Sequence, residues 1–95
     1  MKIPNKLKVG GHEYKVEITK TYDEKKEHNN WGQTNHVKLK IYLDEGLANT
    51  KMEETFIHEL LHAVDSHQGN ILKEGQVDKI ANTLYAVLKD NNLLK

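Results

Sequence analysis

The hydrophobic pattern of this chain changes its period near residue 45, and this change restricts the possible folds most strongly. Before it, apolar residues alternate with polar ones, as at Val37, Leu39, Ile41 and Leu43, which is the pattern of a half-buried strand. After it, apolar residues recur every three or four positions, as in amphipathic helices. Strands followed by helices predict an α+β fold, with a small antiparallel sheet of about three or four strands and two packed helices.

The chain has 95 residues, which is the length of one domain, and we expect residues 1–95 to form a single unit with a modest core. The N-terminus lacks the apolar stretch of a signal peptide, and no run approaches the roughly 18 apolar residues of a membrane span. These features predict a soluble, cytoplasmic protein.

The composition restricts the possible partners and metal ligands. Lys and Arg together number 14, as do Asp and Glu, so the formal net charge is zero and neither nucleic acid nor an anionic membrane is an expected partner. There is no cysteine, which excludes disulfides, thiolate catalysis and cysteine ligation of zinc. Any metal must therefore be bound by histidines and carboxylates.

Three strands are expected in the first half of the chain. The runs Lys8–Val9 and Tyr14–Ile18 flank the pair Gly10–Gly11, a pattern typical of a β-hairpin. Residues 21–30 are polar and nearly free of aliphatic side chains, which predicts a connecting loop. The alternating residues 37–43 then predict a strand with one buried face.

Two helices are expected in the second half. The Asn and Thr at positions 49–50 are both residues that cap helices, and the apolar pattern extends the first helix to residues 65–67. Gly69 is suited to helix termination and Asn70 to the start of the second helix. That helix extends to about Asp90 and carries one apolar stripe.

The first helical region contains His58-Glu59-Leu60-Leu61-His62, an H-E-x-x-H pattern. On a helix, His58 and His62 lie on nearly the same side and about 6 Å apart along the axis, so both imidazoles can bind one ion. Glu59 is rotated by about 100° from His58 and can instead reach a water on the metal. The spacing predicts two metal ligands and a catalytic base.

A catalytic zinc site needs a third protein ligand. Asp65 lies about 10.5 Å along the same helix from His58, too far to close a compact site. His67 does not fit either, because the metzincin arrangement would require Gly and His where this chain has Asp65 and Gln68. Glu74 lies beside the inward stripe of the second helix, and a short loop before that helix can present it to the histidines. Asp78, one turn further on, is expected either to orient a ligating imidazole or to be the third ligand itself.

Glu74 and Asp78, following the H-E-x-x-H pattern, resemble the E-x-x-x-D element of thermolysin-type gluzincins. The layout of residues 37–88 is similar to the ImmA/IrrE-type metallopeptidase domains of bacteria and phages. This resemblance implies a zincin-like fold, Zn²⁺ as the cofactor, Glu74 as the third ligand and Asp78 as the residue that supports a histidine. It also implies a His or Tyr that steadies the oxyanion, but no spacing ties any such residue to the metal; the candidates are Tyr42, Tyr85, His36 and His28.

Two functions are therefore expected. The first is a zinc-dependent metalloendopeptidase, in which Glu59 activates the zinc-bound water and a peptide or protein substrate lies along an edge strand at residues 37–43. The second is a non-catalytic module for protein interaction, in which zinc only stabilises the two helices.

Overall fold

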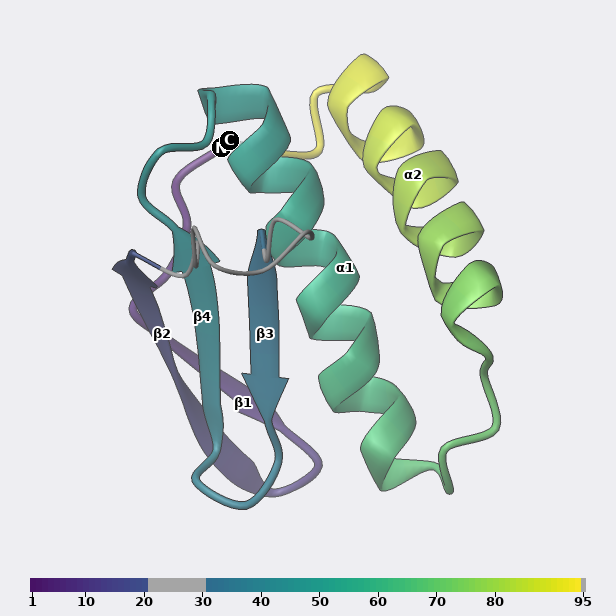
Figure 1. Ribbon diagram of the computed structural model, residues 1–95. Coiled ribbons are helices and arrows are strands. Elements are labelled where there is room, and N and C mark those ends of the chain that lie inside the picture. Colours follow the sequence, from purple (N-terminus) through teal and green to yellow (C-terminus); the bar gives the residue numbers. More distant parts are fainter. Residues whose placement is uncertain (21–30, 95) are drawn as a thin grey trace.

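The computed structural model describes residues 1–20 and 31–94, and its elements follow the expected order of strands and then helices. The expected loop at residues 21–30 lies outside the described residues. Figure 1 shows the sheet, α1 and α2 side by side, with α1 in the middle. The α+β fold is confirmed. The elements are β1 (Lys6–Val9), β2 (His12–Thr19), β3 (Gly32–Asn35), β4 (Lys40–Asp44), α1 (Asn49–His67) and α2 (Glu74–Asp90).

The sheet is mixed and has the strand order β1-β2-β4-β3. β1 and β2 form the expected hairpin around Gly10 and Gly11, whose φ angles of 58° and 82° suit a tight turn. β3 and β4 are also antiparallel, but β2 and β4 are parallel. The expectation of a purely antiparallel sheet is thus wrong at one pairing, because the β3–β4 hairpin joins β2 through its second strand.

The strand expected at residues 37–43 begins only at Lys40, because Asn35 starts a turn. The Asn35 Oδ1 accepts hydrogen bonds from the backbone N–H groups of Val37 (3.0 Å) and Lys38 (2.8 Å), as Asn side chains commonly do in turns. Leu39 then has a φ of 57°. Residues 32–35 form the edge strand β3, and β4 lies between β2 and β3, so the expectation that residues 37–43 form an edge is wrong.

Both helices end near the expected residues, but their starts differ. Asn49 is the first residue of α1, and the N-cap is Ala48, which makes no side-chain cap. Asn70 lies in the turn that follows α1 and does not start α2, because its φ is 54° and its N–H donates to the Asp65 carbonyl oxygen (2.9 Å). The second helix begins at Glu74, which places this carboxylate in the first turn of α2.

The core lies mainly between the sheet and α1, and α2 closes it from the other side. Within the described residues, the backbone of α2 approaches α1 and no strand, so α1 positions α2. None of the described helices is both long and apolar enough to span a membrane. The buried apolar residues come from the sheet (Val9, Tyr14, Ile41, Leu43), from α1 (Phe56, Ile57, Ala63) and from α2 (Val77, Ala81, Tyr85).

Candidate metal centre

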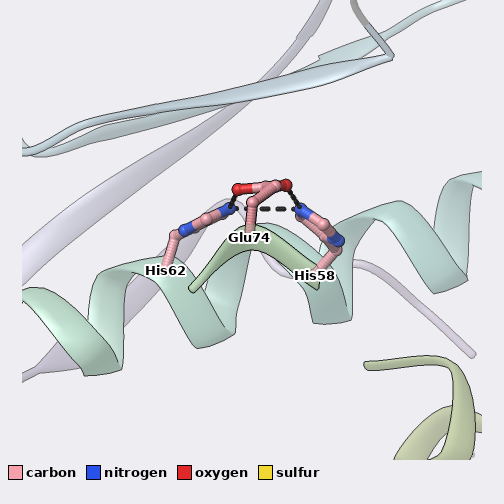
Figure 2. Close-up of side chains that lie close together, drawn as sticks. All are labelled: His58, His62 and Glu74. Carbon is pink, nitrogen blue, oxygen red and sulfur yellow. Dashed lines mark hydrogen bonds and ion pairs between the residues drawn. The ribbon is translucent and has the colours of Figure 1, made fainter. Parts of the chain in front are cut away.

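His58, His62 and Glu74 converge where the start of α2 crosses α1. The Glu74 Oε1 lies 2.9 Å from the Nε2 of His58, and its Oε2 lies 3.0 Å from the Nε2 of His62. The two Nε2 atoms are 3.1 Å apart, and Figure 2 shows both imidazoles pointing toward the carboxylate. The structure brings together the three residues that the sequence predicts as metal ligands.

Asp78 lies on the other side of His58. Its Oδ1 is 3.0 Å from the Nδ1 of His58. An ionised carboxylate can only accept a hydrogen bond, and carboxylates face both ring nitrogens of His58; with a cation at Nε2, the hydrogen of the neutral imidazole would lie on Nδ1 and be donated to Asp78. This pairing orients the ring in the way that carboxylates commonly do for metal-binding histidines. Among the described residues, Glu74 therefore lies with the two histidines in a group that could hold a metal ion, and Asp78 contacts the far side of His58.

The donor atoms suit a cation. With the hydrogen of His58 on Nδ1, as a cation at Nε2 would require, the Nε2 lone pair would face a carboxylate oxygen of Glu74, which without the cation is a contact between two acceptors. A positive ion between them would turn this repulsive contact into coordination. Around a tetrahedral zinc with Zn–N distances of about 2.0–2.1 Å, ligand atoms lie about 3.3 Å apart, a few tenths of an ångström from the separations found here. Two histidines and one glutamate are also a ligand set of catalytic zinc sites.

Asp65, which the sequence had excluded as a third ligand, helps to position Glu74 because it holds the loop between the two helices. Its side chain is 4% exposed, and its Oδ1 accepts hydrogen bonds from the backbone N–H groups of Ile71 (3.0 Å) and Leu72 (3.3 Å). These bonds fold the loop back against the end of α1, two residues before Glu74. His67 contacts Tyr14 and is not part of the metal group.

Glu59 lines the same cleft as the three candidate ligands and contacts β3. Its side chain is 7% exposed, and its Oε1 accepts a hydrogen bond from the Thr34 hydroxyl (2.8 Å). Burial raises the pKa of the Glu59 carboxyl, while the Thr34 hydrogen bond and the charges of His58 and His62 oppose this shift. A raised pKa makes a carboxylate a stronger base.

Two hollows meet at Glu59 and His62. One is a cleft of about 580 Å³ between α1, the start of α2 and the start of β3, and it contains all three candidate ligands. The other, about 490 Å³, lies beside the rest of β3 and the turn after it. Trp31, whose ring lies under the Lys51 ammonium at 4.0 Å, forms one end of the cleft. Between them, the two hollows are lined by all four residues of β3 and share Glu59 and His62.

The proposed oxyanion residues have different positions. His36 lines the second hollow together with Glu59 and His62, and its pKa is lowered by burial and then by the nearby histidine charges. Tyr85 is buried and donates to Glu53, whereas Tyr42 lies on β4 and lines neither of these hollows. His28 lies outside the described residues.

Sequence reasoning did not identify Thr34. The strand that carries it, Gly-Gln-Thr-Asn, has no apolar alternation, and its contact with Glu59 joins residues 25 positions apart. The one local signal was Asn35, because asparagine favours turns and could have indicated a turn between β3 and β4.

The chain was compared with protein-family models, with curated proteins and with solved structures, and none of the three comparisons found a match.

Proposed function

We propose that this protein is a zinc-dependent metalloendopeptidase. The observation that carries the proposal is the arrangement of two histidines and a glutamate around one point, with a separate buried carboxylate beside them. In a chance H-E-x-x-H pattern there is no reason for a second helix to supply both Glu74, at 2.9–3.0 Å from the imidazoles, and Asp78, at 3.0 Å from Nδ1. The resemblance to the E-x-x-x-D element of gluzincins agrees with these roles.

The residues have distinct roles in this proposal. His58, His62 and Glu74 bind zinc, and Asp78 keeps the His58 hydrogen on Nδ1. Zinc bound there supplies a Lewis acid that polarises water and the scissile carbonyl group. Glu59 accepts a proton from the attacking water and donates it to the leaving nitrogen as the C–N bond breaks.

The substrate strand is expected next to β3, not next to residues 37–43. Within residues 1–20 and 31–94, β3 pairs only with β4, so we expect its other edge to offer backbone groups that can bind an extended peptide. One hollow is lined by Gly32 and the other by Gln33, Thr34 and Asn35, and both are lined by Glu59. A substrate that extends on both sides of the scissile bond fits this arrangement, which supports internal cleavage.

The zero net charge and the lack of cysteine suit a protein of the reducing cytoplasm, which we propose as its compartment. A bacterial or phage origin, and hence a host cytoplasm, belongs to the same proposal and rests on the resemblance alone.

One observation favours a second function, a zinc-stabilised module for protein interaction. The backbone of α2 approaches only α1 among the described elements, and Glu74 joins the two helices through both histidines. Zinc at this position would stabilise the helix pair even without catalysis.

Glu59→Gln separates the two functions, because it removes the base and keeps the shape of the side chain. In an enzyme, we expect peptide hydrolysis to fall at least about 100-fold, while zinc per chain and the melting temperature change little. Glu13→Gln, the same change at an exposed position on β2, is the control and should keep full activity. Full hydrolysis by Glu59→Gln would refute its role as the base. A zinc-loaded wild type that cleaves no peptide in a diverse peptide library would favour the interaction module.

A further inference from the structure

The register of β3 places two of its residues on the face that α1 covers. Gly32 pairs with Leu43 and Thr34 pairs with Ile41, and both partners are fully buried under the helix. Paired residues on neighbouring strands point to the same face of a sheet. Gly32 and Thr34 therefore face α1, in agreement with the position of β3 beside this helix in Figure 1.

Gly32 allows β3 to approach α1 closely at the position of Glu59. A Cβ atom on residue 32 would lie 2.8 Å from the Thr55 Cγ2 and 3.1 Å from the Glu59 Cγ. It would also lie 3.1 Å from the Tyr42 carbonyl oxygen, which is backbone and cannot rotate away. A larger residue would push β3 away from the helix, so the contact between this strand and Glu59 depends on a glycine.

Thr34 uses this close approach to contact Glu59 twice. Its Oγ1 lies 2.8 Å from the carboxylate Oε1 and 3.1 Å from the main-chain carbonyl oxygen of the same residue. We propose that Thr34 is the positioning residue of the catalytic base, holding the Glu59 carboxylate toward the water that attacks the substrate. This inference rests on the proposed peptidase function.

The chemistry of the base explains why such an anchor is useful. A glutamate side chain has three rotatable bonds, and burial alone does not select one orientation of its carboxylate. The Thr34 hydroxyl donates to Oε1 and leaves Oε2 for the reacting water. A proton taken from water on Oε2 can pass to the leaving nitrogen while the hydrogen bond to Oε1 persists. The anchor therefore needs no rearrangement during the reaction.

A purely structural role for Thr34 makes different predictions. If the hydroxyl only joined β3 to α1 through the main-chain oxygen, its loss would lower stability and disturb the cleft as a whole. Substrate binding would then weaken, and KM would rise. If Thr34 positions the base, its loss acts on kcat, because a misplaced catalytic group slows the chemical step with little effect on binding.

The test compares zinc-loaded wild type with Thr34→Val, which keeps the side-chain shape without the hydroxyl, and Thr34→Ser, which keeps the hydroxyl. For Thr34→Val we expect kcat to fall about 10- to 100-fold, with KM within about twofold and zinc per chain unchanged. Thr34→Ser should retain kcat within about threefold of wild type. A wild-type kcat in Thr34→Val, or an equal fall of kcat in both variants, would overturn the proposal. Thr34→Ala replaces Thr34→Val, with the same criteria, if the valine variant does not fold.

Crystal structures of the same zinc-loaded proteins show whether Thr34 orients the Glu59 carboxylate, with no need to measure hydrolysis. We expect the Glu59 carboxylate to keep its orientation in Thr34→Ser and to rotate or become disordered in Thr34→Val. An unchanged carboxylate in Thr34→Val would overturn the positioning role. If wild type cleaves no peptide, the proposed peptidase function fails, and this comparison still shows whether Thr34 orients Glu59.

Discussion

Asp78 lies 3.0 Å from the Nδ1 of His58, on the side of the imidazole opposite the nitrogen that faces Glu74. The two residues come from different helices, so this contact joins α1 to α2 and, with a cation at Nε2, would keep the His58 hydrogen on Nδ1. Glu74 and Asp78 are four residues apart, about one helical turn, and the same face of α2 therefore supplies the ligand and the support. One imidazole thus joins both ends of the E-x-x-x-D element.

Removing the Asp78 carboxylate should weaken metal binding without abolishing it. In Asp78→Ala, His58 loses the partner that keeps Nε2 free for the metal, and we expect the zinc dissociation constant to rise about 10- to 100-fold. In Asp78→Asn the amide oxygen can still accept from Nδ1, and the rise should be smaller. Competition with a zinc chelator of known affinity measures both variants. Equal affinity of wild type and Asp78→Ala would show that the contact has no role in metal binding.

Asp65 should stabilise the loop that positions Glu74. In Asp65→Ala the N–H groups of Ile71 and Leu72 lose their buried acceptor, and we expect the free energy of unfolding to fall by about 1–3 kcal/mol. Zinc affinity should fall as well, because the start of α2 becomes less well placed. Asp65→Asn keeps an acceptor oxygen and is the matched control. Urea unfolding of the zinc-free proteins measures the effect on stability separately from the effect on zinc affinity. Unchanged stability in Asp65→Ala would refute the role of Asp65 in holding the loop.

The contact of Tyr85 with Glu53 predicts how stability depends on pH. Glu53 accepts hydrogen bonds from the N-terminal amino group (2.8 Å) and from the Tyr85 hydroxyl (2.6 Å). These two bonds, the first more than the second, are the main causes that lower the pKa of Glu53. A lowered carboxyl pKa contributes stability above the pKa of the unfolded state, and this contribution is lost as pH falls through the folded pKa. Burial and then the hydrogen bond to Glu53 raise the pKa of Tyr85 to about 12. The stability that Tyr85 contributes is therefore fully present below about pH 10, the pKa of a free tyrosine, and is lost as pH rises toward 12.

Tyr85→Phe tests this dependence, because it removes the hydroxyl and keeps the ring in the core. We expect the variant to be about 1–3 kcal/mol less stable near pH 7. The difference from wild type should shrink below about pH 4 and again above about pH 10. Urea unfolding over this pH range measures it. A difference that stays constant with pH would contradict the assigned pKa shifts.

The sequence was sufficient to predict which residues meet at the candidate metal centre, because their geometry is mainly local. His58 and His62 are one helical turn apart, and helix periodicity alone places them on one face. Glu74 followed from a short interhelical loop, although α2 begins four residues later than Asn70. The part of the site formed by β3 was not predicted, because the contact between Thr34 and Glu59 depends on how the sheet packs on α1.

The strand prediction for residues 37–43 failed for a specific reason. Val37 fits the alternating pattern of the strand, yet it is 93% exposed, because the side chain of Asn35 bonds to the backbone N–H groups that follow it. A local side-chain contact thus overrode the apolar alternation. The error moved the predicted edge of the sheet from β3 to residues 37–43, and with it the expected position of the substrate.

The measurement that tests the central claim most directly is the zinc content of freshly purified, chelator-free protein. Our account predicts about one zinc per wild-type chain and much less in Glu74→Ala, because that variant keeps only two of the three ligands. Glu13→Ala, which removes an exposed carboxylate far from the site in the fold, should retain the wild-type content. No zinc in wild type, even after zinc is added back, or equal zinc in wild type and Glu74→Ala, would contradict the metal site.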